Sequence, residues 1–157
     1  MIGKLFVFSA MVFLLTSRCD QKDPVSSLQE EVQEVILIGS RNVFSSSEDH
    51  ASIQEASIQG DQLNLKVIYG GGCKKHDFTL FASEGFLESS PVQAELFLFH
   101  DAHGDSCEAL ITEELLFDLS PLKKLYKSMY QDNGPLLLRI YEPGETDSFK
   151  VLIIYEF

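Results

Sequence analysis

An alternation of apolar side chains constrains the fold of this chain more than any other feature. Between residues 63 and 69 an apolar side chain recurs at every second position: Leu63, Leu65, Val67 and Tyr69. Successive side chains of a β-strand point to opposite faces, so this period predicts a strand with one buried face. Gly60-Asp61 lies between this segment and the apolar segment 53–58, which predicts a β-hairpin.

Segments of similar character recur along the chain and set the fold class. We expect strands over residues 32–44, 53–58, 63–69, 77–82, 92–99, 107–119, 136–141 and 149–155. Ser120-Pro121 predicts the start of one short helix, because serine suits the cap and proline the first helical position. About eight strands and one helix predict an all-β fold, either an Ig-like β-sandwich or a barrel-like arrangement.

The first 18 residues have the features of an export signal. Lys4 precedes an apolar run over residues 5–15, which is too short to span a bilayer. The segment resembles a bacterial lipoprotein signal, which would make Cys19 the lipidated first residue. Residues 19–31 would then form a lipid-anchored polar tether, and residues 32–157 a single domain. An ordinary secretory signal is the alternative, because Arg18 stands where lipoprotein signals carry a small residue.

The charge of the chain excludes one class of partner. The net charge is −12, and removal of residues 1–18, with Lys4 and Arg18, takes it to −14. A domain this acidic repels nucleic acid and anionic headgroups, so we expect no nucleic-acid partner. The sequence also lacks a P-loop, a dinucleotide fingerprint and the common hydrolase motifs. We therefore expect a protein that is not an enzyme and uses no cofactor.

Cys73 and Cys107 are expected at one end of the sheet. If segments 77–82 and 92–99 form an antiparallel hairpin, the chain before the first and after the second lies at the same end. Cys73 falls in the former stretch and Cys107 in the latter. Three histidines are expected near this end: His76, His100 and His103.

Three chemistries could use this cluster. A disulfide is favoured, because export is oxidising and an anchor at Cys19 leaves an even pair. A zinc site is the main alternative, since Cys-x-x-His is an accepted ligand spacing. Its ligands would be Cys73, His76, His103 and Cys107, with His100 as a substitute for His103. A reactive thiol activated by His76 would also need a transition-state donor, which the sequence does not identify.

Three stretches of the chain resemble NigD-like bacterial lipoproteins, which share a Gly-Gly-Cys-x-x-His-x-Phe core. They are Tyr69–Phe78, His100–Leu110 and Phe117–Ser120. The resemblance implies a β-sandwich on the cell envelope. Because the family is named after a bacteriocin locus, it also implies that an immunity or protective role is possible. It brings no catalytic residues.

Three functions follow from these observations. The leading one is a non-catalytic lipoprotein of the bacterial cell envelope, held to the membrane by Cys19 and acting through binding or assembly. The second is a metal-binding protein built on the cysteines and histidines above. The third is an immunity-like or inhibitor-like module that binds an envelope protein through the aromatic-rich strand around Phe97 and Phe99.

Overall fold

The chain folds into nine strands and one helix, over the residues that the structure describes. The structure is a computed structural model that describes residues 31–39, 49–131 and 133–157. The predicted signal segment, Cys19 and the tether up to residue 30 lie outside these ranges. The elements are β1 (Val32–Glu34), β2 (Ile36–Ile38), β3 (Ala51–Gln59), β4 (Gln62–Gly71), β5 (Asp77–Ser83), β6 (Val92–Asp101), β7 (Ala109–Asp118), α1 (Ser120–Tyr130), β8 (Leu136–Tyr141) and β9 (Val151–Tyr155).

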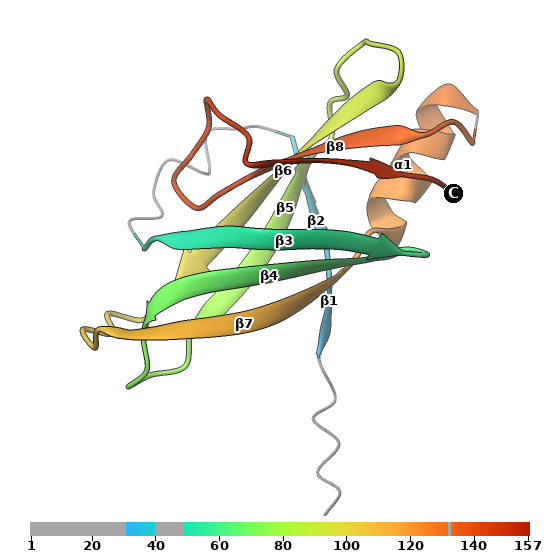
Figure 1. Cartoon of the computed structure of the whole chain (residues 1–157). Helices are drawn as coiled ribbons and strands as arrows, with labels where there is room; N and C mark the ends of the chain where they lie inside the picture. Colours follow the sequence, from blue (N-terminus) through green and yellow to red (C-terminus); the bar gives the residue numbers. More distant parts are fainter. Residues whose placement is uncertain (1–30, 40–48, 132) are drawn as a thin grey trace, which may run out of the picture.

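The strands form two sheets that pack face to face (Figure 1). The front sheet has the order β1-β7-β4-β3, and the back sheet has the order β2-β5-β6-β8-β9. Each sheet is mixed, because β1 is parallel to β7, β2 to β5 and β6 to β8. Within the described residues the two sheets form a sandwich and not a closed barrel. The all-β sandwich predicted from the sequence is therefore confirmed.

The first predicted strand is divided between the two sheets. Val35 separates β1 in the front sheet from β2 in the back sheet, and its side chain is only 3% exposed. Its N–H donates to the carbonyl of Asp118 at 3.1 Å. The chain thus crosses the core at one residue. The continuous apolar run Val35–Ile38 gave no sign of this crossing, because an apolar run looks the same on either sheet.

The core lies between the sheets and follows the predicted alternation. Leu63, Leu65 and Val67 on β4 are fully buried, and Tyr69 is nearly so. Leu80 on β5 and Leu96 on β6 face them from the back sheet. Burial of one such leucine stabilises the fold by about 1.5–3 kcal/mol relative to leaving it exposed.

Helix α1 covers the end of the sandwich opposite the disulfide described below (Figure 1). Ser120 is its first residue rather than its cap, and Pro121 stands in the first turn as predicted. The Asp118 carboxylate accepts hydrogen bonds from the backbone N–H and the hydroxyl of Ser120. In the described ranges, no helix combines the length and the apolar character needed to cross a membrane.

Candidate functional site

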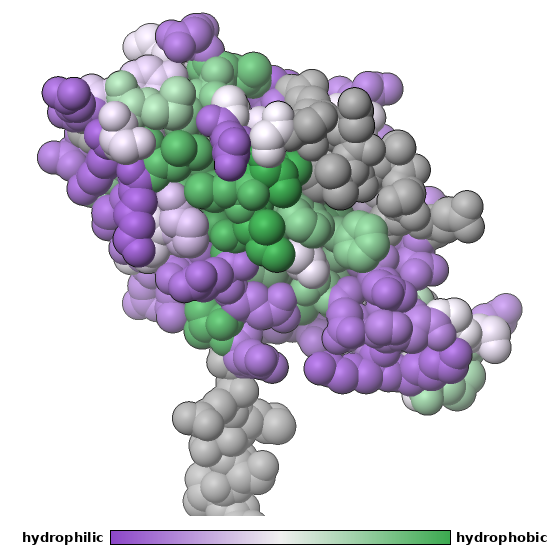
Figure 2. Space-filling view, turned by 180° about the vertical axis from the view of Figure 1, so that it is seen from behind, coloured by the Kyte–Doolittle hydropathy of each residue, from purple (hydrophilic) through white to green (hydrophobic). Residues whose placement is uncertain are grey.

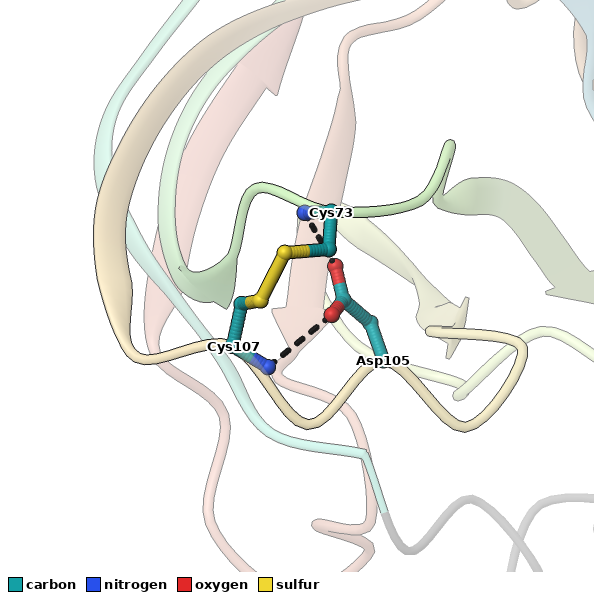
Figure 3. Close-up of side chains that lie close together, drawn as sticks. All are labelled: Cys73, Asp105 and Cys107. Atoms are coloured by element: carbon teal, nitrogen blue, oxygen red, sulfur yellow. Dashed lines mark hydrogen bonds between the residues drawn. A yellow bond between two sulfur atoms is a disulfide. The ribbon is translucent and has the colours of Figure 1, made fainter.

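A disulfide between Cys73 and Cys107 joins two loops that cross between the sheets (Figure 3). The two residues are 34 positions apart and their Cα atoms are 5.9 Å apart. They meet because β4 and β7 are antiparallel neighbours that end at the pair Gly71 and Ala109. The predicted hairpin of β5 and β6 is present, but the pairing of β4 with β7 is what brings the cysteines together.

Asp105 holds the backbone of both cysteines. One oxygen, Oδ2, accepts the N–H groups of Cys73 and Lys74, both at 2.9 Å. The other oxygen, Oδ1, accepts the N–H of Cys107 at 2.9 Å (Figure 3). The bond from Cys107 is the largest cause that lowers the pKa of Asp105 well below its ordinary value, although burial opposes the shift. The carboxylate therefore fixes the geometry of the disulfide.

Sequence reasoning missed Asp105, although its spacing gave a signal. An aspartate side chain often accepts the N–H of the residue two positions later, which forms a local turn. Asp105 and Cys107 have this spacing, and the bond between them is the one observed. The further reach to Cys73 depends on the pairing of β4 with β7, which the local sequence does not reveal.

Two of the three histidines are buried beside this end of the core. His76 Nδ1 lies 2.8 Å from His100 Nε2, and His76 Nε2 lies 3.3 Å from Asp105 Oδ2. The His100 ring also stacks on Phe78, with centroids 4.4 Å apart. Burial, and secondarily the nearby His76, lowers the pKa of His100. This is a hydrogen-bonded polar layer inside the core.

The third histidine, His103, interacts with Asp77 and not with the cysteines. His103 is exposed, and its Nε2 lies 2.7 Å from Asp77 Oδ2. The hydrogen bond to Asp77 is the main cause that raises the pKa of His103. Among the described residues, the side chains close enough to share a metal ion are Cys73, Asp105 and Cys107, within 4.8 Å of one another. Both thiols are in the disulfide, so a zinc site here would first require its reduction.

The outer face of the back sheet carries a group of exposed or half-buried apolar side chains. We call these six residues the back face: Ile36, Ile38, Phe81, Phe99, Leu152 and Ile154. Ile36, Leu152 and Ile154 are 46%, 50% and 54% exposed, and the others are half-buried. Figure 2 shows apolar residues gathered on this side of the molecule, with hydrophilic residues around them. These side chains point away from the core between the sheets, so packing of the main core does not explain why they are apolar.

The aromatic strand β6 supplies only part of this face. Phe97 is 2% exposed and stacks on Tyr141, so it belongs to a small buried cluster. Phe99 is half-buried, and its ring meets Phe81 edge-on with centroids 6.2 Å apart. Of the two aromatic residues singled out from the sequence, Phe99 is therefore the one that can contact a partner.

Comparison with known proteins places the fold. No protein-family model and no curated protein matches the sequence. Similar solved structures include a protein of unknown function (DUF1344) from Bacteroides vulgatus, with a TM-score of 0.52 and 17% identity, over 80% of this chain and 56% of that one. They also include a NigD-like immunity protein from Bacteroides caccae, with a TM-score of 0.51 and 17% identity, over 79% of this chain and 58% of that one.

These likenesses establish the fold. The resemblance to NigD-like proteins seen in the sequence is thereby confirmed at the level of the fold. The chain covers less than two thirds of the length of either solved structure.

Proposed function

We propose that this protein is a lipid-anchored protein of the bacterial cell envelope that binds a protein partner through its back face. The observation that carries the proposal is the exposure of Ile36, Leu152 and Ile154, each between 46% and 54%, on one sheet face. Apolar surface that gathers on one side of a soluble domain, inside a polar rim, is typical of a site for another protein.

The anchor and the charge support this proposal. A lipid at Cys19 and a tether to residue 31 would keep the domain within about 40 Å of the membrane, at 3.3–3.6 Å per extended residue. The net charge of −14 from residue 19 onward disfavours contact with anionic headgroups. A protein partner close to the membrane therefore suits the back face better than the lipid surface does.

An immunity role is a specific form of this function. The solved structure from Bacteroides caccae is described as a NigD-like immunity protein, and it shares this fold. The exposed apolar side chains of the back face favour binding of a protein as the mode of action. We accordingly propose binding, without catalysis, as the way in which the domain acts.

A photo-cross-linking residue at position 154 tests the proposal in envelope preparations of the native host. Position 154 is chosen because Ile154 is 54% exposed. We expect one discrete cross-linked partner, and we expect Leu152→Ser to remove it while leaving the thermal unfolding of the protein unchanged.

The matched control is the same cross-linker at position 57. Ser57 is exposed on the front sheet, away from the back face. A product common to positions 154 and 57, or a product that survives Leu152→Ser, would show that the back face is not the binding site.

A further inference from the structure

The fold accounts for two of three consecutive glycines. A Cβ atom on Gly71 would lie 2.6 Å from the ring of His76. Gly72 has φ +113°, which side chains rarely adopt. A Cβ atom on Gly70 would meet nothing within 4 Å, and its φ is not in the left-handed region. Glycine weakens a strand, and often marks a place where another molecule approaches the backbone closely.

Gly70 forms the floor of an open hollow of about 440 Å³ on the outer face of the front sheet. Its partner in the register is Leu110, which at 76% is the most exposed of the large apolar side chains described. Ile68 and Leu110 provide apolar walls, and Ser52, His50 and Glu142 provide polar ones. Most of these residues come from the ends of β3, β4 and β7 that lie together on the left of Figure 1, whereas His50 directly precedes β3 and Glu142 directly follows β8.

The disulfide keeps this floor in register. Gly71 and Ala109 are the last paired residues before the cysteines, and Gly70 and Leu110 are the next pair. The hollow therefore lies directly beside the covalent link, where the two strands cannot separate.

Glu142 places a carboxylate in one wall of the hollow. Glu142 Oε1 accepts the Ser52 hydroxyl at 2.9 Å and the Ile53 N–H at 2.8 Å, and lies 3.4 Å from Lys150 Nζ. Within the described chain, no hydrogen bond goes to the other oxygen, Oε2. The acidic character of the whole domain adds to this local charge and attracts cations.

We propose that this hollow binds a protein segment that sets an apolar side chain on Gly70 and a lysine or arginine beside Glu142. The apolar side chain contacts Ile68 and Leu110 and approaches the bare backbone. The cation pairs with Glu142 Oε2. The site is on the opposite sheet from the back face, and its proposal stands independently of the function proposed above.

Amide chemical shifts of the oxidised protein, titrated with the blocked dipeptide acetyl-Phe-Arg-amide, test the site. We expect saturable shifts centred on Gly70 and Leu110. Gly70→Val, which fills the hollow, should weaken binding about tenfold. Glu142→Gln keeps an oxygen for Ser52 and Ile53, so it should abolish the preference for acetyl-Phe-Arg-amide over acetyl-Phe-Glu-amide while the fold is retained.

Three outcomes would overturn the proposal. They are an absence of shifts at Gly70 and Leu110 at millimolar dipeptide, equal binding of the arginine and glutamate dipeptides, and unchanged binding by Gly70→Val. Leu152→Ser is the matched control, because it changes the back face alone. It should bind acetyl-Phe-Arg-amide as the unaltered protein does, and a loss of binding would also count against the site.

Discussion

Asp105 links segments that are far apart in the sequence. Its carboxylate accepts N–H groups from residues 32 and 31 positions earlier and from one two positions later. A buried carboxylate is stable only when hydrogen bonds replace its lost water, and three backbone donors with His76 do so here. Since both cysteine N–H groups bind the same carboxylate, Asp105 holds the two cysteine backbones beside each other.

Buried His100 predicts a loss of stability in mild acid. The pKa of His100 is lowered from its ordinary value of 6.5, so the unfolded chain binds more protons than the folded one. The stability is therefore present above about pH 6.5 and declines as the pH falls below it. Chemical denaturation across pH 5–7 measures this decline, and His100→Phe should flatten it.

His103 must be controlled in that experiment. Its pKa is raised by Asp77, so its contribution is present below pH 6.5 and is lost as the pH rises through the folded pKa. The comparison is therefore made in a His103→Gln background. If the free energy of unfolding of His103→Gln does not change between pH 7 and pH 5, then His100 does not cause the predicted loss of stability.

Gly70→Ala should stabilise the protein. The added methyl group meets nothing within 4 Å, and the backbone conformation suits alanine. The substitution reduces the freedom of the unfolded chain and should raise the free energy of unfolding by about 0.4–1 kcal/mol. Urea denaturation checks this value. Gly72→Ala is the counterpart, and it should lower stability because of its φ of +113°.

At the scale of elements, β4 and β7 form the best-connected pair of strands in the structure. Their register runs without interruption from Gln62 and Asp118 to Gly71 and Ala109. The disulfide closes this pair at one end. At the other end Asp61 accepts hydrogen bonds from Lys123 of α1 and Tyr155 of β9. The front sheet, the helix and the back sheet are thus joined around this pair.

Removal of the disulfide should lower stability without changing the fold. Closure of a loop between cysteines 34 positions apart is worth about 3–4 kcal/mol in the chain-entropy model. We expect Cys73→Ser with Cys107→Ser to lower the free energy of unfolding by about that amount, and to keep the far-ultraviolet spectrum. A loss below about 1 kcal/mol would contradict the chain-entropy expectation.

The local sequence pattern predicted the strands and the helix well, but it did not predict which strands pair or which distant residues form hydrogen bonds. The alternation on β4 and the Ser120-Pro121 helix start depend on neighbouring residues, which the sequence displays directly. The crossing at Val35 and the bond from Asp105 to Cys73 depend on which strands pair. The separate position of His103 depends on Asp77, a partner 26 residues away. Pairing is decided by burial over the whole chain, so a local pattern cannot show it.

At the scale of the whole molecule, the sandwich has two outer faces of different character. The back face exposes aliphatic and aromatic side chains, whereas the outer side of the front sheet is polar apart from four apolar residues, Val32, Ile68, Leu110 and Leu116. The sequence predicted the sandwich and pointed to β6 as a surface for a partner. It could not separate buried Phe97 from half-buried Phe99, since both point to the same side of β6.

The proposed anchor predicts the location of the protein in the cell. Labelled fatty acid should appear in the full-length protein in the native host, and Cys19→Ala should remove the label and release the protein from membranes. Cys73→Ala is the control, because it removes another cysteine and should keep the label. Labelling that survives Cys19→Ala would show that the anchor is elsewhere, and no labelling at all would favour an ordinary secretory signal.

The division of the first strand at Val35 has a mechanical consequence. β1 lies parallel to β7 and β2 lies parallel to β5, with the buried Val35 between them. A pull along the axis of β1 from residue 31 acts on several ladder hydrogen bonds at once, in shear, instead of opening them one after another. If β1 separated from β7, β2 would remain paired with β5 in the back sheet. Tension that arrives through the N-terminal side is therefore divided between both sheets.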